Sequence, residues 1–425
     1  MTIQTQIQPT AAETALLEAF GGALGQLPGD AAITTQRSTL VQGIKTLGLP
    51  TRRREAWHYT DLRSLLRTVP AQTFATTPGV AEPLVAGSTV LAVVNGEATA
   101  RSAIAGASVK TYAESLRDGS ALKGLALRHA DDAVARVNGG FVTDGYAVNF
   151  PEGYQGAAPV EFQFIQGGGF VNTRLPVHFG AGAKATVIER HLAGGDAASL
   201  VSHVSDITLG AGSDIIWIIQ QQQGGADQHL GQIRVKFGRD AKLTLYVLNA
   251  GGKLVRQDIF VDVDGEGSAF TLRGINLLGG QTHTDVTMSL GHNVADTTST
   301  EIIRNVVFDQ ARGVFQGQIR VAPDAQKTDA KMSCNTLLLS DEAEFSAKPE
   351  LEIFADDVQC GHGATVADIS DTHLFYLKSR GISEPKARAL LVQAFVQEIV
   401  EELEDEALVE ALKGVIGDWL DTHVG

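Results

Sequence analysis

The stretch LPVHFGAGAKATVIERH, residues Leu175–His191, combines a strand-like run, a glycine-rich corner and a second strand-like run. The same unit recurs three more times, as SDITLGAGSDIIWIIQQ (Ser205–Gln221), IRVKFGRDAKLTLYVLN (Ile233–Asn249) and IFVDVDGEGSAFTLRGI (Ile259–Ile275). The corners are 30, 28 and 27 residues apart, and they begin at Gly180, Gly210, Gly238 and Gly265. A unit that recurs every 20 to 50 residues, roughly, is typical of a repeat architecture, here with two strands in each repeat.

This repeat predicts a parallel β-solenoid, in which each coil stacks its strands about 4.8 Å from those of the next coil. Alternate side chains such as Ile215, Trp217 and Ile219 are expected to face inward and fill a continuous core. Hairpin meanders also give short strands, but they need not repeat a strand, a corner and a strand at this spacing. The region between residues 90 and 365 has room for about eight to ten such coils.

The segments on either side of the solenoid are predicted to be helical. Residues 1–70 contain helix-forming runs, and residues 71–87 are rich in Ala, Thr and Pro, as linkers often are. The solenoid is expected over 88–367, with a helical insertion at about 120–138, and a second helical module over 368–425. The C-terminal helices are expected to cap the end of the stack, because an open end invites association between edges.

The composition disfavours several classes of partner and location. The chain has 34 Lys and Arg against 49 Asp and Glu, so its formal net charge is −15, and no basic stripe for nucleic acid runs along it. No apolar run approaches the roughly 18 residues that a membrane helix needs, and the N-terminus lacks the pattern of a secretory signal. Two cysteines, Cys334 and Cys360, are too few for a disulfide framework, which predicts a reducing, cytoplasmic location.

The segment LEIFADDVQCGHGAT (Leu351–Thr365) carries the candidate chemistry. Cys360 and His362 are two residues apart on a strand-like run, so their side chains are expected to point to the same side. Thiolate and imidazole suit iron–sulfur clusters, copper and zinc as ligands. The spacing alone also fits a buried cysteine beside a hydrogen-bonded histidine, since a closed zinc site needs more ligands. Cys334 is 26 residues before Cys360 and could therefore lie on a neighbouring coil.

Three segments together resemble a known family. They are GVFQGQIRVAPDAQKTDAKMSCNTLLLSDEAEFSAKPELEIFADDVQCGHGATVADI (Gly313–Ile369), LFYLKSRGI (Leu374–Ile382) and REAWHYTDL (Arg54–Leu62). They are similar to the SufB/SufD family of iron–sulfur cluster assembly proteins, and within it to the SufD branch. The similarity extends over the N-terminal helical module, the solenoid and the C-terminal helices, which is nearly the whole chain.

The resemblance implies a mainly β fold, a flattened right-handed parallel β-helix between two helical modules, with no catalytic turnover of its own. It implies that the chain pairs with a SufB-like scaffold, or with itself as a homodimer when alone. It also implies that the chain binds a SufC-like ABC ATPase. A transient iron–sulfur cluster would be shared with the SufB partner, and no cofactor would stay bound to the isolated chain.

The resemblance also implies which residues form the sites. His362 and Cys360 would contact the nascent cluster or its iron at the partner interface, with His362 as the principal functional residue. Leu374, Phe375 and Arg380 would dock the ATPase. SufB scaffolds carry additional cysteines, whereas this chain has two, and this difference favours the accessory subunit.

Two other classes of protein are considered from the residues alone. A β-helix carbohydrate lyase or glycosidase would need paired carboxylates or a calcium site on one face, and usually a secretion signal. Asp356 and Asp357 are adjacent on an extended run, so their side chains would point to opposite faces. A purely structural solenoid is the third interpretation, and co-purification with an ATPase would separate the assembly protein from both alternatives.

Overall fold

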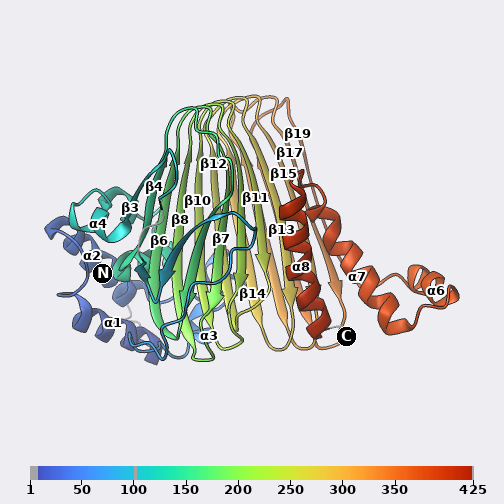
Figure 1. Cartoon of the computed structure of the whole chain (residues 1–425), viewed down its shortest axis with the longest axis horizontal. Helices are drawn as coiled ribbons and strands as arrows, with labels where there is room; N and C mark the ends of the chain where they lie inside the picture. The colour runs from blue at the N-terminus through green and yellow to red at the C-terminus, as the bar shows by residue number, and fades with distance from the viewer. Residues whose placement is uncertain (1–7, 100–102, 424–425) are drawn as a thin grey trace, which may run out of the picture.

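Two long β-sheets face each other at the centre of the protein, and helices cover their outer faces (Figure 1). The structure, a computed structural model, describes residues 8–99 and 103–423. Sheet A runs in spatial order through β2 (Glu97–Ala98), β1 (Thr89–Val94), β5 (Val160–Gln166), β7 (Lys184–Ala193), β9 (Asp214–Gln222), β11 (Lys242–Asn249), β13 (Ala269–Leu278), β15 (Thr298–Val307), β17 (Asp329–Leu338) and β19 (Gln359–Ala367). Sheet B runs through β3 (Ser108–Thr111), β4 (Asp144–Phe150), β6 (Gly169–Phe179), β8 (Ser199–Leu209), β10 (Gln228–Phe237), β12 (Leu254–Val263), β14 (His283–His292), β16 (Arg312–Val321) and β18 (Glu344–Ile353).

From β4 onward, successive strands alternate between the two sheets, so the chain winds in coils whose strands pair in parallel. Among the described strands, only β1 with β2 and β3 with β4 pair antiparallel. The register keeps equivalent residues in line, as where Leu245 lies between Trp217 and Leu272. The predicted fold class, a flattened parallel β-helix flanked by helices, is therefore confirmed, with about eight coils.

Glycine is required at four of the corners that lead from sheet B to sheet A, where a Cβ atom would meet the preceding corner. The backbone amide of Gly210 donates to the carbonyl of Phe179 at 2.8 Å, and that of Gly238 donates to the carbonyl of Leu209 at 2.8 Å. A Cβ atom on Gly265 would lie 2.0 Å from the carbonyl oxygen of Gly238. Each of these corners therefore packs on the backbone of the previous corner, which explains the recurring glycines at Gly180, Gly210, Gly238 and Gly265. The corners of later coils make the same backbone bond with Asn293 and Ala322.

The space between the sheets contains a continuous apolar core and a polar row. The core is filled by inward-facing aromatic and aliphatic side chains such as Trp217 and Phe270. In the polar row, Asn249 Nδ2 donates to Asn276 Oδ1 at 2.7 Å, and Asn276 Nδ2 donates to Asn305 Oδ1 at 2.7 Å. Buried amides thus pair with one another from coil to coil, so an inner position of this β-helix need not be apolar.

The N-terminal helices cover the outer face of sheet B. The helical elements before the main strands are α1 (Ala11–Ala23), α2 (Ala31–Leu47), η1 (Glu55–Trp57), α3 (Leu62–Leu65), α4 (Tyr112–Arg117), η2 (Leu122–Leu125) and α5 (Ala133–Phe141). Helix α1 begins with a capping box, in which the amide of Glu13 donates to Thr10 Oγ1 at 3.2 Å and the amide of Thr10 donates to Glu13 Oε2 at 2.7 Å. Apolar side chains of α1, α2 and α5 form one cluster with Phe170 and Leu200 of sheet B.

The C-terminal helices lie alongside sheet A, and the expectation that they cap the end of the stack is wrong. They are α6 (Asp371–Ser379), α7 (Glu384–Val400) and α8 (Glu406–His423), and Figure 1 shows α7 and α8 beside the later strands with α6 projecting away. Their apolar side chains pack on outward-facing residues of sheet A such as Ile218 and Tyr246. The Tyr246 hydroxyl also donates to the carbonyl of Ile399 at 2.8 Å. This apolar outer stripe, rather than the open end, is what the helices bury.

Residues 71–87 contain no regular helix or strand and run along the outer face of sheet A. The amide of Ala81 donates to Gln163 Oε1 at 2.9 Å, and the amide of Leu84 donates to Glu161 Oε2 at 2.7 Å. Both acceptors are buried side chains of β5, so this segment is fixed to the sheet by hydrogen bonds. Among the helices in the described part of the chain, none is both long and apolar enough to cross a membrane.

Candidate functional site

Cys360 and His362 lie on β19, the last strand of sheet A. Strand β19 pairs with β17 on one side, and the described residues place no strand on its other side. Cys360 is opposite Ala330 and His362 is opposite Met332, and both of these β17 residues are buried in the core between the sheets. The thiol and the imidazole therefore share the inward face of the final coil, as their spacing predicts.

The final coil, formed by β18 and β19, is open where earlier coils are covered; we call it the terminal coil. His362 is exposed, whereas Cys360 is partly buried against the apolar core. Burial raises the pKa of the Cys360 thiol, the nearby Asp329 carboxylate raises it further, and a backbone hydrogen bond with Ala330 opposes both effects. Large apolar side chains are also exposed at this end of the molecule, namely Ile353, Phe354 and Val366.

The two cysteines lie on adjacent strands but are not neighbours. Cys334 of β17 is opposite Ala364, whereas Cys360 is opposite Ala330, so they are offset by four residues along the strands. At about 3.3 Å per residue this offset is roughly 13 Å, too far for a disulfide or for a shared metal ion. Burial raises the pKa of Cys334 to about 12, so its thiol stays protonated and is a poor ligand.

The residues expected to dock an ATPase lie on and just after α6. Leu374 is 7% exposed and belongs to the apolar core of the C-terminal helices. Phe375 is 72% exposed, the neighbouring Tyr376 is 56% exposed, and the guanidinium of Arg380 lies 5.2 Å from the Tyr376 ring centroid. The exposed face of α6 is therefore aromatic and cationic, while Leu374 holds the helix to the body.

The segment Arg54–Leu62, one of the three that carry the family resemblance, is fixed on the outer face of sheet B. The Arg256 guanidinium lies 4.2 Å from the Trp57 ring centroid and binds Asp285 at 2.6 Å and Asp258 at 2.8 Å. Desolvation tends to lower the pKa of this buried guanidinium, but Asp258 and Asp285 raise it overall. The segment therefore contributes a structural anchor, and its own histidine, His58, is exposed.

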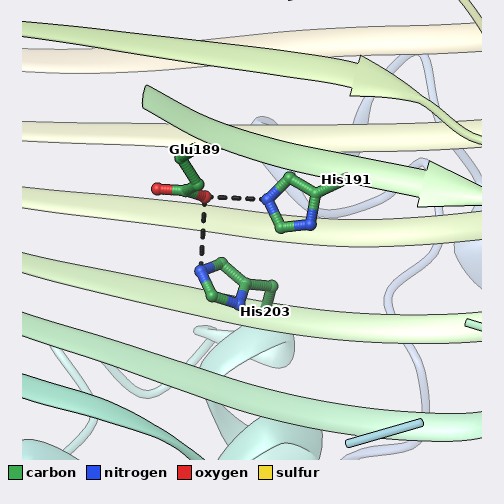
Figure 2. A group of neighbouring side chains, drawn as sticks. All are labelled: Glu189, His191 and His203. Carbon is green, nitrogen blue, oxygen red and sulfur yellow. Dashed lines mark hydrogen bonds and ion pairs between the residues drawn. The ribbon is translucent and has the colours of Figure 1, made fainter. Parts of the chain in front are cut away.

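A second group of potential ligands, which sequence reasoning missed, is buried inside the β-helix (Figure 2). Glu189 and His191 of β7 and His203 of β8 form this group, which we call the buried cluster. Glu189 Oε1 lies 2.8 Å from His191 Nε2 and 3.3 Å from His203 Nε2. Burial acts to raise the pKa of Glu189, but the charges and hydrogen bonds of His203 and His191 hold it well below its usual range.

One signal in the sequence could have indicated the buried cluster. Glu189-x-His191 and His203-x-Ser205 place polar side chains at alternate positions on two strands, where the repeat otherwise places apolar ones. The two segments are joined by a corner, and their convergence depends on both strands turning these positions inward. That orientation follows from the sheet register, which becomes known only with the structure.

Comparisons with known proteins agree with this architecture. Residues 163–395 match the family described as SUF system FeS cluster assembly, SufBD core domain. Over 397 residues the chain is 30% identical to the iron–sulfur cluster assembly protein SufD of Escherichia coli, a match that covers 89% of this chain and 91% of that protein. The chain therefore belongs to the SufB/SufD family of iron–sulfur cluster assembly proteins, on its SufD branch.

Two matching proteins from other organisms cover less of the chain. A SufBD family protein of Synechocystis is 31% identical over 200 residues, which is 47% of this chain and 44% of that protein. The chloroplastic protein ABCI7 of Arabidopsis thaliana is 26% identical over 288 residues, which is 64% of this chain and 60% of that protein.

Proposed function

We propose that this protein is a non-catalytic scaffold subunit that helps to build a nascent iron–sulfur cluster and pass it on. The observation that carries the proposal is the open terminal coil, where a thiol and an imidazole lie together on the inward face of the edge strand β19. The cluster is the cargo of this reaction rather than a resident cofactor, so it is expected to bind only in passing.

The number of ligands argues for a shared site. Cys360 and His362 offer one sulfur and one nitrogen, whereas iron–sulfur clusters are commonly held by four protein ligands. The remaining ligands would come from a partner chain, and a SufB-like scaffold is the partner that the family suggests. A site divided between two chains can release its cargo when the chains separate, which suits assembly and transfer.

The edges of the terminal coil favour a partner of the same architecture. Strands β18 and β19 are the outermost strands of sheets B and A, so both present backbone donors and acceptors at the same end. Exposed edges of this kind pair readily with strands of another chain. We therefore propose that a SufB-like β-helix pairs with this end, and that a second copy of the chain does so when that partner is absent.

The short connection from β19 to α6 suggests how an ATPase would act on the site. Only three residues separate Ala367, the end of β19, from Asp371, the start of α6. We propose that a SufC-like ATPase docks on the exposed face of α6 through Phe375 and Arg380. A movement of that helix during ATP hydrolysis would then be transmitted directly to the strand that carries Cys360 and His362.

The chemistry of the site also suggests where the protein works. Both cysteines are free thiols in the structure, and a thiol must stay reduced to act as a ligand for a transient cluster. We therefore propose a reducing compartment, the cytoplasm, as the place of assembly.

The decisive experiment replaces the two ligands in the complete complex. The chain is co-expressed with SufB-like and SufC-like partners, and cluster formation is followed by visible absorption during reconstitution. Cys360→Ser and His362→Ala are each expected to lower cluster occupancy about tenfold or more, because a ligand is removed. His178→Ala is the matched control, since His178 is also an exposed strand histidine but faces outward on β6. Full occupancy with His362→Ala in an intact complex would rule out the proposed role.

Docking of the ATPase is tested separately by affinity measurement. Phe375→Ala should weaken binding of the SufC-like subunit roughly tenfold, as expected for an aromatic anchor in an interface. Phe74→Ala, which changes a partly exposed phenylalanine in the N-terminal half, should leave the affinity unchanged. Equal binding by both variants would remove α6 from the proposed interface.

A further inference from the structure

The buried cluster has the composition and the geometry of a metal site. The ligand atoms of Glu189, His191 and His203 all lie within 4.8 Å of one another. Two ligand atoms bound to one ion at about 2.1 Å lie roughly 3 to 3.4 Å apart. The distances from Glu189 Oε1, 2.8 Å to His191 Nε2 and 3.3 Å to His203 Nε2, are close to this range. Only small movements would therefore place the three atoms around one ion.

The surroundings orient the carboxylate of Glu189. Ser205 Oγ donates to Glu189 Oε2 at 2.8 Å, and Trp217 Nε1 donates to the same oxygen at 3.1 Å. These bonds leave Oε1 facing the two imidazoles (Figure 2). A metal-binding carboxylate is commonly held in this way, with one oxygen fixed by hydrogen bonds and the other directed at the ion.

His203 is held in a similar way from its far side. Its Nδ1 atom lies 2.8 Å from Thr173 Oγ1, a buried hydroxyl on β6. Its Nε2 atom lies 2.9 Å from Ser205 Oγ and 3.3 Å from Glu189 Oε1. With an ion bound, Nδ1 would carry the proton and donate to the Thr173 hydroxyl, and Nε2 would direct its lone pair at the ion. This is the tautomer that a ligating histidine adopts when its second nitrogen is hydrogen-bonded.

The charge of the site favours a cation. Glu189 is 2% exposed, and among the described residues its recorded ion-pair partners are His191 and His203, with no lysine or arginine. Burying an unpaired carboxylate is costly, so the site needs a positive charge, which either protons or a metal ion can supply.

Unsatisfied nitrogen atoms beside the cluster point to a missing ligand rather than to protons alone. His191 Nδ1 and His229 Nδ1 are buried and have no hydrogen-bond partner among the described residues. The two rings are close, with centroids 4.6 Å apart, so a third imidazole borders the cluster. A bound ion with a coordinated water would give the polar atoms of this pocket partners that the side chains alone do not supply.

We propose that Glu189, His191 and His203 bind one divalent first-row transition-metal ion inside the β-helix, at a site separate from the terminal coil. Two imidazoles and one carboxylate with open positions suit Fe²⁺ and Zn²⁺ and are a poor set for Mg²⁺ or Ca²⁺. All three residues are buried, so the ion enters while the coils form and is then retained.

The test measures retained metal in the full-length chain. A Cys360→Ser/His362→Ala background removes the ligands of the terminal coil, so that any signal comes from elsewhere. The protein is unfolded with a chelator, refolded with Zn²⁺, with Co²⁺ as a spectroscopic probe, or anaerobically with Fe²⁺, and then desalted. About one equivalent of metal should remain bound, and Co²⁺ should give visible absorption bands.

Variants identify the site that holds the ion. His203→Gln and Glu189→Gln should each lower retained metal roughly tenfold or more. His292→Gln is the matched control, because His292 is a buried histidine hydrogen-bonded to Thr297 and Ser299 far along the stack, and it should retain the metal.

The metal retained by the Cys360→Ser/His362→Ala protein itself tests the proposal, even where a further variant fails to fold. Less than about a tenth of an equivalent retained with all three metals would mean that protons alone neutralise the cluster, and would overturn the proposal. Equal retention by the His203→Gln variant and its parent would place the ion elsewhere and would overturn it as well.

Discussion

The buried cluster and the Cys360–His362 pair lie on the inward face of the same β-helix, yet they differ completely in access. Glu189 is 2% exposed and has paired strands on both sides of its own strand. His362 is exposed because β19 has a neighbour on one side only among the described strands. Similar ligand types can therefore form a sealed site or an open one, and the position of the coil in the stack decides which. A solenoid can carry both kinds of site without any change of fold.

The largest effect on the free energy of unfolding is expected from removing the buried carboxylate of Glu189. Glu189→Ala leaves the Trp217 indole, the Ser205 hydroxyl and two imidazoles without their buried acceptor. The free energy of unfolding should fall by about 3–5 kcal/mol, as for other broken buried pairs. Glu352→Ala on the exposed strand β18 should change it by less than about 0.5 kcal/mol. Equal losses in denaturant titrations would contradict the distinction between sealed and open positions.

Substitutions at two glycines, one in a buried corner and one in the terminal coil, should show the same difference in stability at a smaller magnitude. A Cβ on Gly265 would lie 2.0 Å from backbone of the preceding corner, whereas a Cβ on Gly361 of β19 would meet no atom within 4 Å. Gly265→Ala should cost roughly 1–3 kcal/mol, because stacked backbone cannot move aside easily. Gly361→Ala should stay within about 0.5 kcal/mol. Thermal unfolding of both variants measures the difference, and a neutral Gly265→Ala would show that the corners are loosely packed.

The last effect is a change of stability with pH, and it concerns a buried acid on β15, two strands away from His362 on β19. Glu301 is in line with Met332, which is in turn in line with His362. Burial raises the pKa of Glu301 to about 8 from an ordinary value of 4.5, against the opposing effects of Ser299 and Arg273. Between these values the folded protein binds a proton that the unfolded chain has lost. The free energy of unfolding should therefore decrease as pH rises, by up to about 1.4 kcal/mol per pH unit.

Glu301→Gln checks this dependence, because the amide has the same shape and does not titrate. Denaturant unfolding at pH 5, 6, 7 and 8, roughly spanning the two pKa values, should give a flatter profile for the variant than for the parent. The variant should be the more stable protein at the upper end. Parallel profiles would mean that water from the open end already reaches this position.

The sequence was sufficient for the part of the fold that depends on local chemistry. The glycines at Gly180, Gly210, Gly238 and Gly265 mark corners where backbone packs on backbone, and a Cβ atom at any of these four positions would lie within 3 Å of the preceding corner. The even spacing therefore revealed the coil, and the two-residue spacing of Cys360 and His362 gave their common face. These features follow from contacts within one repeat or between adjacent repeats.

Features that depend on long-range packing could not be predicted in the same way. The apolar stripes of α7 and α8 indicate that these helices pack on an apolar surface. The sequence offers two such surfaces, the outer face of sheet A and the open end of the stack, and the helices pack on the first. The buried cluster joins two strands across a corner. Its polar residues look like solvent-facing positions in the sequence until the register of the sheets is known. In both cases the missing information was which face of a strand points inward.

The open terminal coil also has a dynamic consequence. In a stack where each repeat is stabilised by its immediate neighbours, the last one has half the usual support and is expected to fray first. Its amide protons should therefore exchange with solvent faster than those of the middle strands. A docked chain would supply the missing neighbour. The terminal coil would then become ordered in the same step in which the two chains bind the cluster.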